Sequence, residues 1–327
     1  MPAGPHPVLR AVTLLMLIFA LLGTPALARA LQVVVVTAEP EAACNAFSDA
    51  LLSDGQQHGH QYRRIHLAPR STPDTDDMAA LAAADLLIGC GGMATEALLE
   101  METHAEAGAA RASLPPILAT LVSRSQFEQL SLRTPPERLS AIVLDQPMSR
   151  HVALIRAMLP DAGRLGFLFS AASLHLEDEL REAATNRTLK TNTRRISTPN
   201  ELLGALDGIL SSSDGLLILP DPVTAAPTLA RPILLSSYRY RKPVFAYSRA
   251  YVEAGALAAV FSTPEDIARD LADLLKHWTA LPDTLPPARA PERFSIATNA
   301  QVARALGLNL PTEATLQARL YQEERAP

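Results

Sequence analysis

Three short apolar segments between residues 214 and 269 constrain the fold more than any other feature of the chain. They lie at residues 215–219, 244–247 and 256–261, and each ends at a polar or proline-containing turn. A helix-length segment, residues 224–241, separates the first two. Short segments that are apolar on both faces and alternate with helices are typical of strands buried in a parallel sheet. We therefore expect an α/β fold whose ligand binds beyond the carboxyl ends of these strands.

A similar alternation fills the N-terminal half of the chain. The β-branched segment LQVVVV at residues 31–36 predicts a buried first strand. Further strands are expected at residues 62–67, 85–90 and 117–121, with helices between them. This β-α-β-α-β-α-β order is the pattern of a doubly wound lobe.

A second α/β series begins near residue 141, where a short strand is expected at residues 141–144. The fold class that follows is two doubly wound, Rossmann-like lobes with a central ligand cleft, which suits a chain of 327 residues. We expect lobe 1 at residues 31–140, completed by about residues 251–285, and lobe 2 at residues 141–250, completed by about residues 292–310. Residues 311–327 are expected to form a charged, helix-prone tail.

Residues 1–30 have the pattern of a cleavable signal peptide. Arg10 precedes the apolar segment 11–22, and two Ala-x-Ala sequences follow it. The apolar segment is shorter than the roughly 20 residues that span a bilayer, so the alternative of an uncleaved anchor is disfavoured. The pattern predicts export and a periplasmic location.

Charge argues against nucleic acid as a partner. The formal net charge is -5, and removal of residues 1–30 would leave 27 basic and 34 acidic residues. A nucleic-acid-binding surface needs clustered basic residues, and the sequence has no strongly basic patch.

The two cysteines, Cys44 and Cys90, allow two interpretations. Each is expected near the cleft rim of lobe 1, where an exported protein could join them in a disulfide. They could equally be two separate, partly buried thiols. Without a suitable histidine spacing, they do not make a metal site. The Gly91-Gly92 pair is interpreted as a tight turn facing the cleft, because it lacks the residues of a phosphate-binding loop.

Three blocks of sequence resemble a known family. They are HVALIRAMLPDAGRLGFLF at residues 151–169, DGLLILPDPV with RKPVFAYSRAYVEAGALAAVFST at 214–223 and 241–263, and FSIATNAQVARALGLNLP at 294–311. In this order they resemble the substrate-binding proteins of ABC importers with the type I periplasmic-binding fold, the group that includes tryptophan- and tyrosine-type binders. The chain departs from that pattern at residues 135–140 and 261–263, near the expected cleft. The ligand of the family is therefore not carried over.

The resemblance implies two lobes joined by three crossing segments, expected near residues 123–141, 247–256 and 286–294. A small-molecule ligand, for which an amino acid is one candidate, would contact both lobes only when the hinge closes. The implied partner is an inner-membrane ABC permease. No cofactor is implied.

Candidate ligand contacts lie at or just beyond the carboxyl ends of the expected strands. They are Thr37, Glu39, Met93, Thr95 and Ser123 in the first lobe, and Ser170, Asp221, Tyr247, Ser248 and Arg249 in the second. Arg249 could hold a carboxylate in two places, and Asp221 could hold an amine. The alternatives are a cap or a surface salt bridge for Arg249 and a turn-forming role for Asp221.

Two other functional classes are alternatives to a transport protein. An enzyme on the same α/β layout is disfavoured, because the sequence has neither a G-x-S-x-G elbow nor a His-Glu-x-x-His motif. A periplasmic sensor that delivers its bound state to a receptor would need the same cleft, so the sequence leaves that alternative open.

Overall fold

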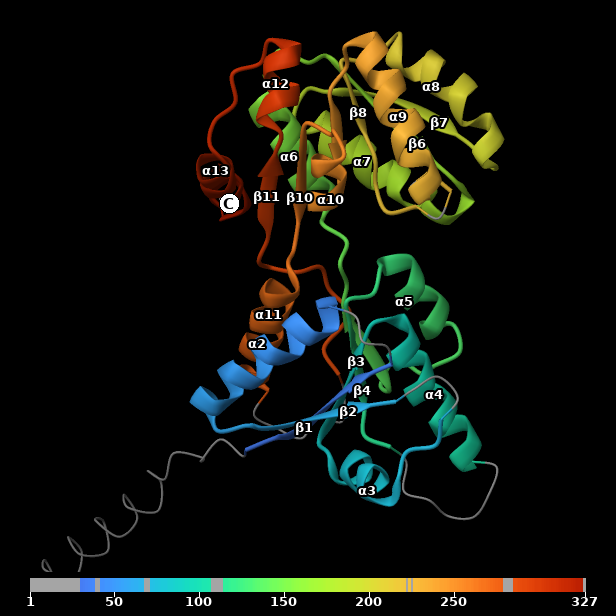
Figure 1. Ribbon diagram of the computed structural model, residues 1–327, viewed down its shortest axis with the longest axis vertical. Coiled ribbons are helices and arrows are strands. Elements are labelled where there is room, and N and C mark those ends of the chain that lie inside the picture. The colour runs from blue at the N-terminus through green and yellow to red at the C-terminus, as the bar shows by residue number, and fades with distance from the viewer. Residues whose placement is uncertain are drawn as a thin grey trace, which may run out of the picture.

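The structure is a computed structural model that describes residues 30–38, 42–67, 71–106, 114–221, 223–224, 226–278 and 285–325. It consists of two α/β lobes, one above the other in Figure 1, each built on its own sheet. The predicted fold class is confirmed. Among the described residues, no helix is both long enough and apolar enough to cross a membrane.

The first lobe is built on a five-stranded parallel sheet in the order β2-β1-β3-β4-β5. The strands are β1 (Gln32–Thr37), β2 (Gln61–His66), β3 (Leu86–Cys90), β4 (Ile117–Thr120) and β5 (Leu139–Ile142). Helices α2 (Ala42–His58) and α11 (Pro264–His277) cover one face of the sheet. Helices α3 (Thr75–Ala83), α4 (Gly92–Glu106) and α5 (Arg124–Ser131) cover the other. Strands β1, β3, β4 and β5 are buried because apolar side chains meet helices on both faces.

The second lobe contains a six-stranded sheet in the order β11-β10-β9-β8-β6-β7, parallel except for the β10–β11 pair. Its strands are β6 (Arg164–Phe169), β7 (Lys190–Arg195), β8 (Gly215–Leu217), β9 (Val244–Ala246), β10 (Ala258–Phe261) and β11 (Ser295–Thr298). Strand β7 is polar because it lies at the edge of the sheet.

Both faces of the second sheet carry helices. Helices α6 (Met148–Met158), α7 (Leu176–Thr185), α12 (Ala300–Leu306) and α13 (Glu313–Arg325) contribute to the core on one side. Helices α8 (Leu202–Leu210), α9 (Pro227–Tyr240) and α10 (Arg249–Glu253) contribute to the core on the other. Two single turns, η1 (Ala171–Ser173) and η2 (Pro199–Glu201), precede α7 and α8.

The expected start of the second lobe near residue 141 was wrong. Strand β5 pairs in parallel with β4, with Ile117 opposite Leu139, so residues 139–142 complete the first sheet. The return to the first lobe also begins later than expected, because β10 stays in the second sheet and only α11 packs against α2. The expected tail forms helix α13, whose Leu316 and Leu320 are buried in the second core. The apolar character of a segment indicates that the segment is buried, but it does not indicate which sheet the segment joins.

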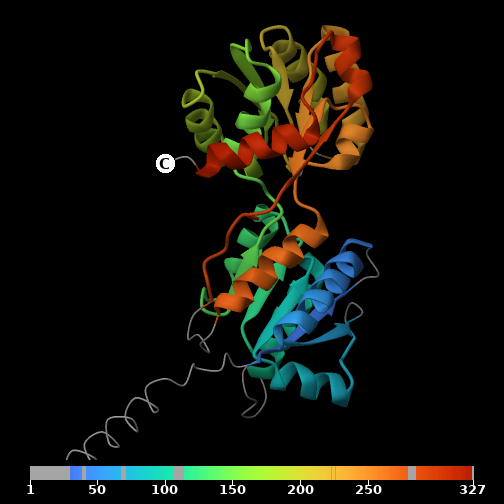
Figure 2. The ribbon, with the colours of Figure 1, turned by 90° about the vertical axis from the view of Figure 1, so that its left-hand side faces the viewer.

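Three segments cross between the lobes, as Figure 2 shows. They are residues 143–147 after β5, residues 262–263 after β10, and the stretch before β11 that lies within the expected range 286–294. The first two lie several residues from the ranges expected from sequence. The third runs beside β5, where Val143 N donates to Arg289 O at 3.0 Å and Arg289 N donates to Ala141 O at 2.9 Å.

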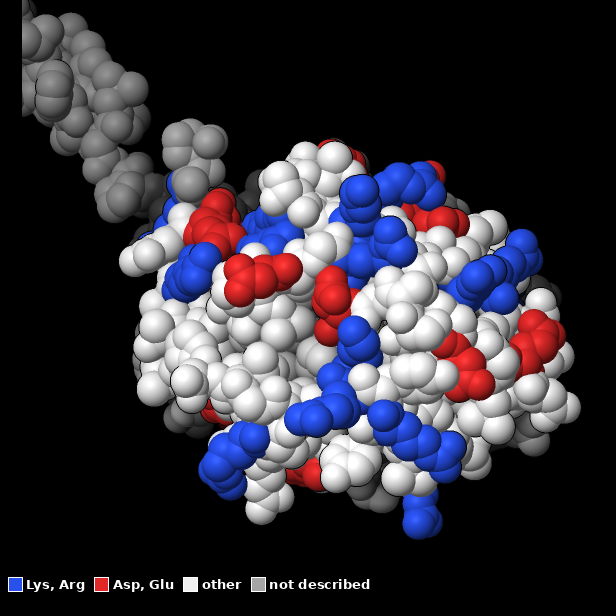
Figure 3. Space-filling model, turned by 90° about the horizontal axis from the view of Figure 1, so that it is seen from above, with Lys and Arg blue, Asp and Glu red and all other residues white. Residues whose placement is uncertain are grey.

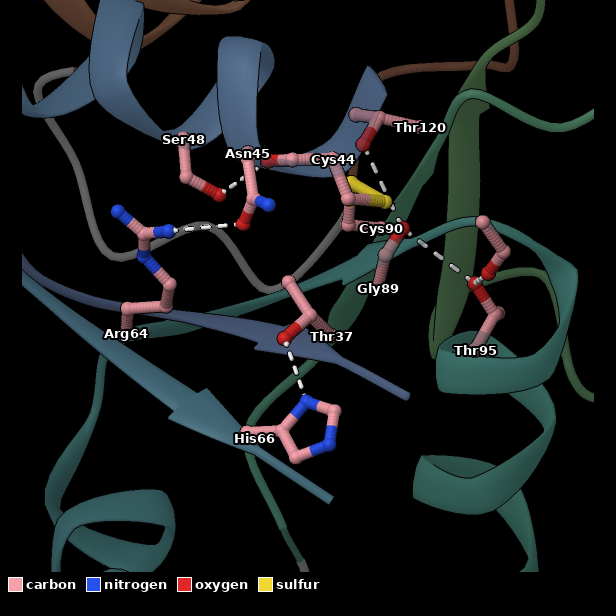
Figure 4. The surroundings of a disulfide bond; sticks show 11 residues. Thr37, Cys44, Asn45, Ser48, Arg64, His66, Gly89, Cys90, Thr95 and Thr120 are labelled. Atoms are coloured by element: carbon pink, nitrogen blue, oxygen red, sulfur yellow. Dashed lines mark hydrogen bonds between the residues drawn. A yellow bond between two sulfur atoms is a disulfide. The ribbon is translucent and has the colours of Figure 1, made fainter. Parts of the chain in front are cut away.

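A disulfide joins Cys44 of α2 to Cys90 at the end of β3, with 5.8 Å between their Cα atoms. Of the two interpretations left open by the sequence, the structure therefore supports the bridge. Figure 4 shows it at the carboxyl end of the first sheet, beside Gly89 and the hydroxyls of Thr95 and Thr120. The bridge fixes the start of α2 to the strand end that faces the second lobe.

Candidate ligand-binding site

A cavity of about 240 Å³ lies between the two lobes. The start of α5 and the crossing segment 143–147 line it from one side. Helices α6 and α7, the loops after β8 and β9, and the end of β10 line it from the other. Its apolar wall is formed by Leu144, Met148, Leu176, Leu219 and Phe261. Mostly apolar walls with a few polar groups are typical of small-molecule sites.

Charged groups gather where α5 begins. A capping box fixes this turn, with Ser123 Oγ accepting from Gln126 N at 3.2 Å. Arg124 N donates to Asp145 Oδ2 at 2.6 Å, and Arg124 Nη1 pairs with Glu179 Oε1 of α7 at 3.0 Å. The second contact is an ion pair between the lobes. Burial raises the pKa of Asp145, while the hydrogen bond and positive charge of Arg124 act to lower it.

His151 of α6 contributes a buried polar ring to the cavity. It is 3% exposed, and burial followed by the positive charge of Arg150 lowers its pKa to about 3. The ring is therefore neutral near pH 7, with one donor and one acceptor nitrogen. No hydrogen bond joins it to any of the described residues. Buried polar groups are normally paired, so His151 is a group that a ligand could satisfy.

The loop after β9 contributes Tyr247 and Ser248. Ser248 caps α10, its hydroxyl accepting from Tyr251 N at 3.3 Å. The rings of Tyr247 and Tyr251 lie 5.8 Å apart, and burial raises the pKa of Tyr247. Both Tyr247 and Ser248 were expected from sequence at the end of this strand. With Ser123 they are the predicted residues that line the cavity.

Three other predicted residues of the first lobe lie elsewhere. Thr37 is buried beside His66, with 3.2 Å between Oγ1 and Nδ1. Thr95 is buried and donates to Gly91 O at 2.9 Å, which stabilises the first turn of α4. Met93 is 47% exposed and does not line the cavity. Glu39 lies outside the described residues.

In the second lobe, Asp221 shapes a loop. Its carboxylate accepts from the backbone of Ser170 at 3.0 Å, Val223 at 2.7 Å and Thr224 at 2.8 Å, and from the Ser173 hydroxyl. Burial alone would raise the pKa of Asp221, but these hydrogen bonds hold it below its ordinary value. Ser170 caps η1. This arrangement favours the turn-forming interpretation of Asp221 over an amine-binding one.

Arg249 is exposed, and its guanidinium lies 5.3 Å from the ring centre of Phe261. Among the described residues it pairs with no carboxylate, so the predicted surface salt bridge is absent there. The arginine that lines the cavity is Arg124. Arg124 and Asp145 both follow strand ends of the first sheet, which is a signal in the sequence, but the sequence predicts Ser123 after β4 and places β5 in the wrong lobe. His151 lies on an apolar helix face and gave no signal.

A buried network ties the three crossing segments together. Gln146 Nε2 donates to Ser262 Oγ at 2.9 Å, and that hydroxyl donates to Arg293 O at 2.5 Å. Arg150 Nη1 donates to Gln146 Oε1 at 2.6 Å and to Pro291 O at 3.1 Å. One side of the cavity is thus continuous with the hinge.

The C-terminal helix joins the same network. The Arg150 guanidinium binds the carboxylate of Glu324 in α13 at 2.6 and 3.0 Å, and lies 4.2 Å from the ring centre of Phe294. Arg150 is 5% exposed. Its charge is therefore neutralised by α13 inside the hinge.

Comparison with known proteins identifies the family. A family model described as ABC transporter substrate binding protein matches residues 79–318. The chain belongs to this family. No curated protein matches the sequence.

Solved structures share the fold of this ABC transporter substrate-binding protein at low identity. One is an ABC domain in complex with L-Trp from Streptococcus pneumonia, 18% identical with a TM-score of 0.54, covering 88% of this chain and 98% of that one. Another is the ligand-free, open structure of a substrate-binding protein with adhesive properties from Clostridium difficile, 17% identical with a TM-score of 0.64, covering 86% and 96%. A third is a periplasmic ribose ABC transporter from Conexibacter woesei, 15% identical with a TM-score of 0.53, covering 89% and 98%.

Proposed function

We propose that the protein is the periplasmic solute-binding component of an ABC importer and traps a small molecule between its lobes by hinge closure. The observation that carries this proposal is a cavity lined from both lobes, to which His151 contributes a ring that is 3% exposed and has no hydrogen bond to any described residue. Membership of the substrate-binding family supports it. In this role the protein binds and releases its ligand unchanged, and its partner is an inner-membrane permease. In this proposal residues 1–30 direct export as a signal peptide and are then removed.

The cavity suggests a ligand class. Its volume of about 240 Å³ lies below the roughly 300–1,000 Å³ of sites for drug-sized molecules, so the ligand is a small metabolite. Apolar walls suit a hydrocarbon or aromatic body. Arg124 is matched by two acids, Asp145 and Glu179. A zwitterion fits this balance, with an ammonium near the acids and a carboxylate near Arg124, so we propose an amino-acid-like ligand.

Thermal unfolding against a panel of amino acids and other small metabolites tests this function. A ligand at about 100 times its dissociation constant stabilises the folded state by about 2.7 kcal/mol. Arg124→Ala and Arg249→Ala form a matched pair, because only Arg124 lines the cavity. We expect Arg124→Ala to abolish the shift and Arg249→Ala to retain it. A panel that gives no shift, with protein shown to be free of copurified ligand, would contradict the proposal.

A further inference from the structure

The second lobe has a second, larger hollow at the opposite end of β9 from the ligand cavity. Tyr247, which lines the cavity, follows the end of this strand, whereas Val244 at its start lines the hollow. The hollow has a volume of about 1080 Å³ and lies between α9 and α12. We refer to it as the α9–α12 groove. Nothing in the proposed ligand-binding function uses this end of the molecule, which Figure 3 views from above.

The α9–α12 groove is apolar inside. Small residues, among them Ala230, Gly255 and Ala305, line it and allow a partner backbone to approach closely. Leu235 and Tyr238 of α9 also line it, although they are 51% and 73% exposed. Large apolar side chains exposed around one hollow mark an interaction surface.

Basic residues surround this apolar surface. Arg231, Arg239, Arg241 and Lys242 all line the groove, and none forms an ion pair with any described residue. Figure 3 shows Lys and Arg side chains across this end of the molecule, interspersed with Asp and Glu. Basic residues in the last turn of a helix complement its dipole, which accounts for Arg239. Arg231 lies in the second turn of α9, so the helix dipole does not account for it.

Two nearby acids, Asp207 and Asp214, are already engaged, whereas Glu253, which directly precedes the groove residues Ala254 and Gly255, is exposed. Asp207 accepts a hydrogen bond from Tyr240 Oη at 3.2 Å. Asp214 accepts from the backbone of Gly163 and Arg164 at 2.8 and 2.9 Å, and the charge of Lys242 contributes to the lowering of its pKa. The groove therefore presents an excess of positive charge in a chain whose formal net charge is -5.

Shape and charge together select the occupant. A groove between two helices accommodates a third helix, with its apolar face inward and its charged residues at the rim. The stretch from Ala230 to the end of α9 at Tyr240 corresponds to roughly 15 Å of helix, or about three turns. We propose that the α9–α12 groove binds an acidic amphipathic helix of about 12 residues from a partner protein.

Other occupants fit less well. A second copy placed by a two-fold axis would set the four basic residues against themselves, which is repulsive. Residues 1–30 of the same chain carry Arg10 and Arg29 and no acid. A flat anionic membrane would contact the basic rim but leave the small residues inside the groove uncovered.

Fluorescence anisotropy with a designed peptide tests the proposal. The probe is a labelled helical peptide of about 12 residues, with leucines on one face and glutamates beside them. The comparison peptide carries lysine at every glutamate position. We expect the acidic peptide to bind about ten-fold tighter or better, and to weaken as salt is added because the rim charges are exposed.

Variants locate the binding surface. We expect Leu235→Glu to weaken acidic-peptide binding about ten-fold. We expect the same of a double variant that carries Arg231→Glu and Arg239→Glu. Leu203→Glu on α8 is the matched control, because Leu203 is also an exposed leucine at 61%, and it should leave binding unchanged. Hydrogen exchange should show protection in α9 and α12.

Several results would overturn the proposal. They are equal binding of the two peptides, equal weakening by Leu203→Glu and Leu235→Glu, or protection confined to the cleft. Self-association that Leu235→Glu abolishes would assign the groove to a second copy. Binding to phosphatidylglycerol vesicles without peptide binding would assign it to a membrane. Peptide and vesicle binding at the groove do not require a ligand in the cleft, so the ligand-binding proposal is tested separately.

Discussion

Loss of the Glu324 carboxylate should destabilise the second lobe strongly. Arg150 is 5% exposed, and Glu324 is the charge that neutralises it, at 2.6 and 3.0 Å. Glu324→Ala leaves a buried guanidinium with only neutral partners, and breaking a buried ion pair in this way costs about 3–5 kcal/mol. Glu324 itself is 33% exposed. Arg150→Met therefore leaves behind a carboxylate that water can reach. We expect this variant to lose less free energy of unfolding, about 1–3 kcal/mol.

Urea unfolding followed by two probes measures this effect. Trp278 is the only tryptophan and packs against the first-lobe core, so its fluorescence reports that lobe, whereas far-ultraviolet circular dichroism reports both. Glu324→Ala should shift the dichroism transition and leave the fluorescence transition in place. Arg319→Ala, which breaks an exposed pair on the same helix at 54% exposure, should cost less than about 0.5 kcal/mol. Equal losses of unfolding free energy in Glu324→Ala and Arg319→Ala would refute the reasoning.

Three further outcomes follow from other contacts. Reduction of the disulfide, whose sequence separation is 46, should cost about 4 kcal/mol on the chain-entropy model, measured by urea unfolding with and without reductant. Gly89→Ala would place a Cβ 2.3 Å from Thr95 Oγ1 and should cost about 1–3 kcal/mol, whereas Gly204→Ala in α8 meets nothing within 4 Å and should be stabilising. His151 has a folded pKa of about 3, below the unfolded value of 6.5. The unfolded state therefore takes up its proton first, and stability should fall by about 2 kcal/mol from pH 7 to pH 5, a slope that His151→Phe should flatten in pH-dependent unfolding.

The sequence predicted the architecture because buried parallel strands and amphipathic helices leave local patterns. It predicted the wrong lobe for β5, since LSAI at Leu139–Ile142 would be buried equally well in either sheet. Pairing with β4 is a tertiary choice that no local pattern records. That error displaced the first expected crossing segment, and the unexpected retention of β10 in the second sheet displaced the second.

The candidate site was predicted in part for the same reason. Tyr247 and Ser248 follow a strand that was correctly placed, and both line the cavity. Asp145 was missed because the strand before it, β5, was expected in the second lobe. The strand before Arg124, β4, was placed correctly, but its neighbour Ser123 was predicted in its place. Asp221 looked available in sequence, but four hydrogen bonds within its own lobe occupy its carboxylate. Such contacts depend on loops that come together only in the folded chain.

The central claim is that a small ligand binds between the lobes and closes them. Leu132 in the first lobe and Leu203 in the second are 86% and 61% exposed. Because both native cysteines are in the disulfide, Leu132→Cys and Leu203→Cys can be labelled selectively for fluorescence energy transfer. A ligand from the stabilising panel should change the transfer efficiency in this protein, and the change should disappear when His151→Ala is added. Stabilisation by that ligand with unchanged transfer efficiency would contradict the account.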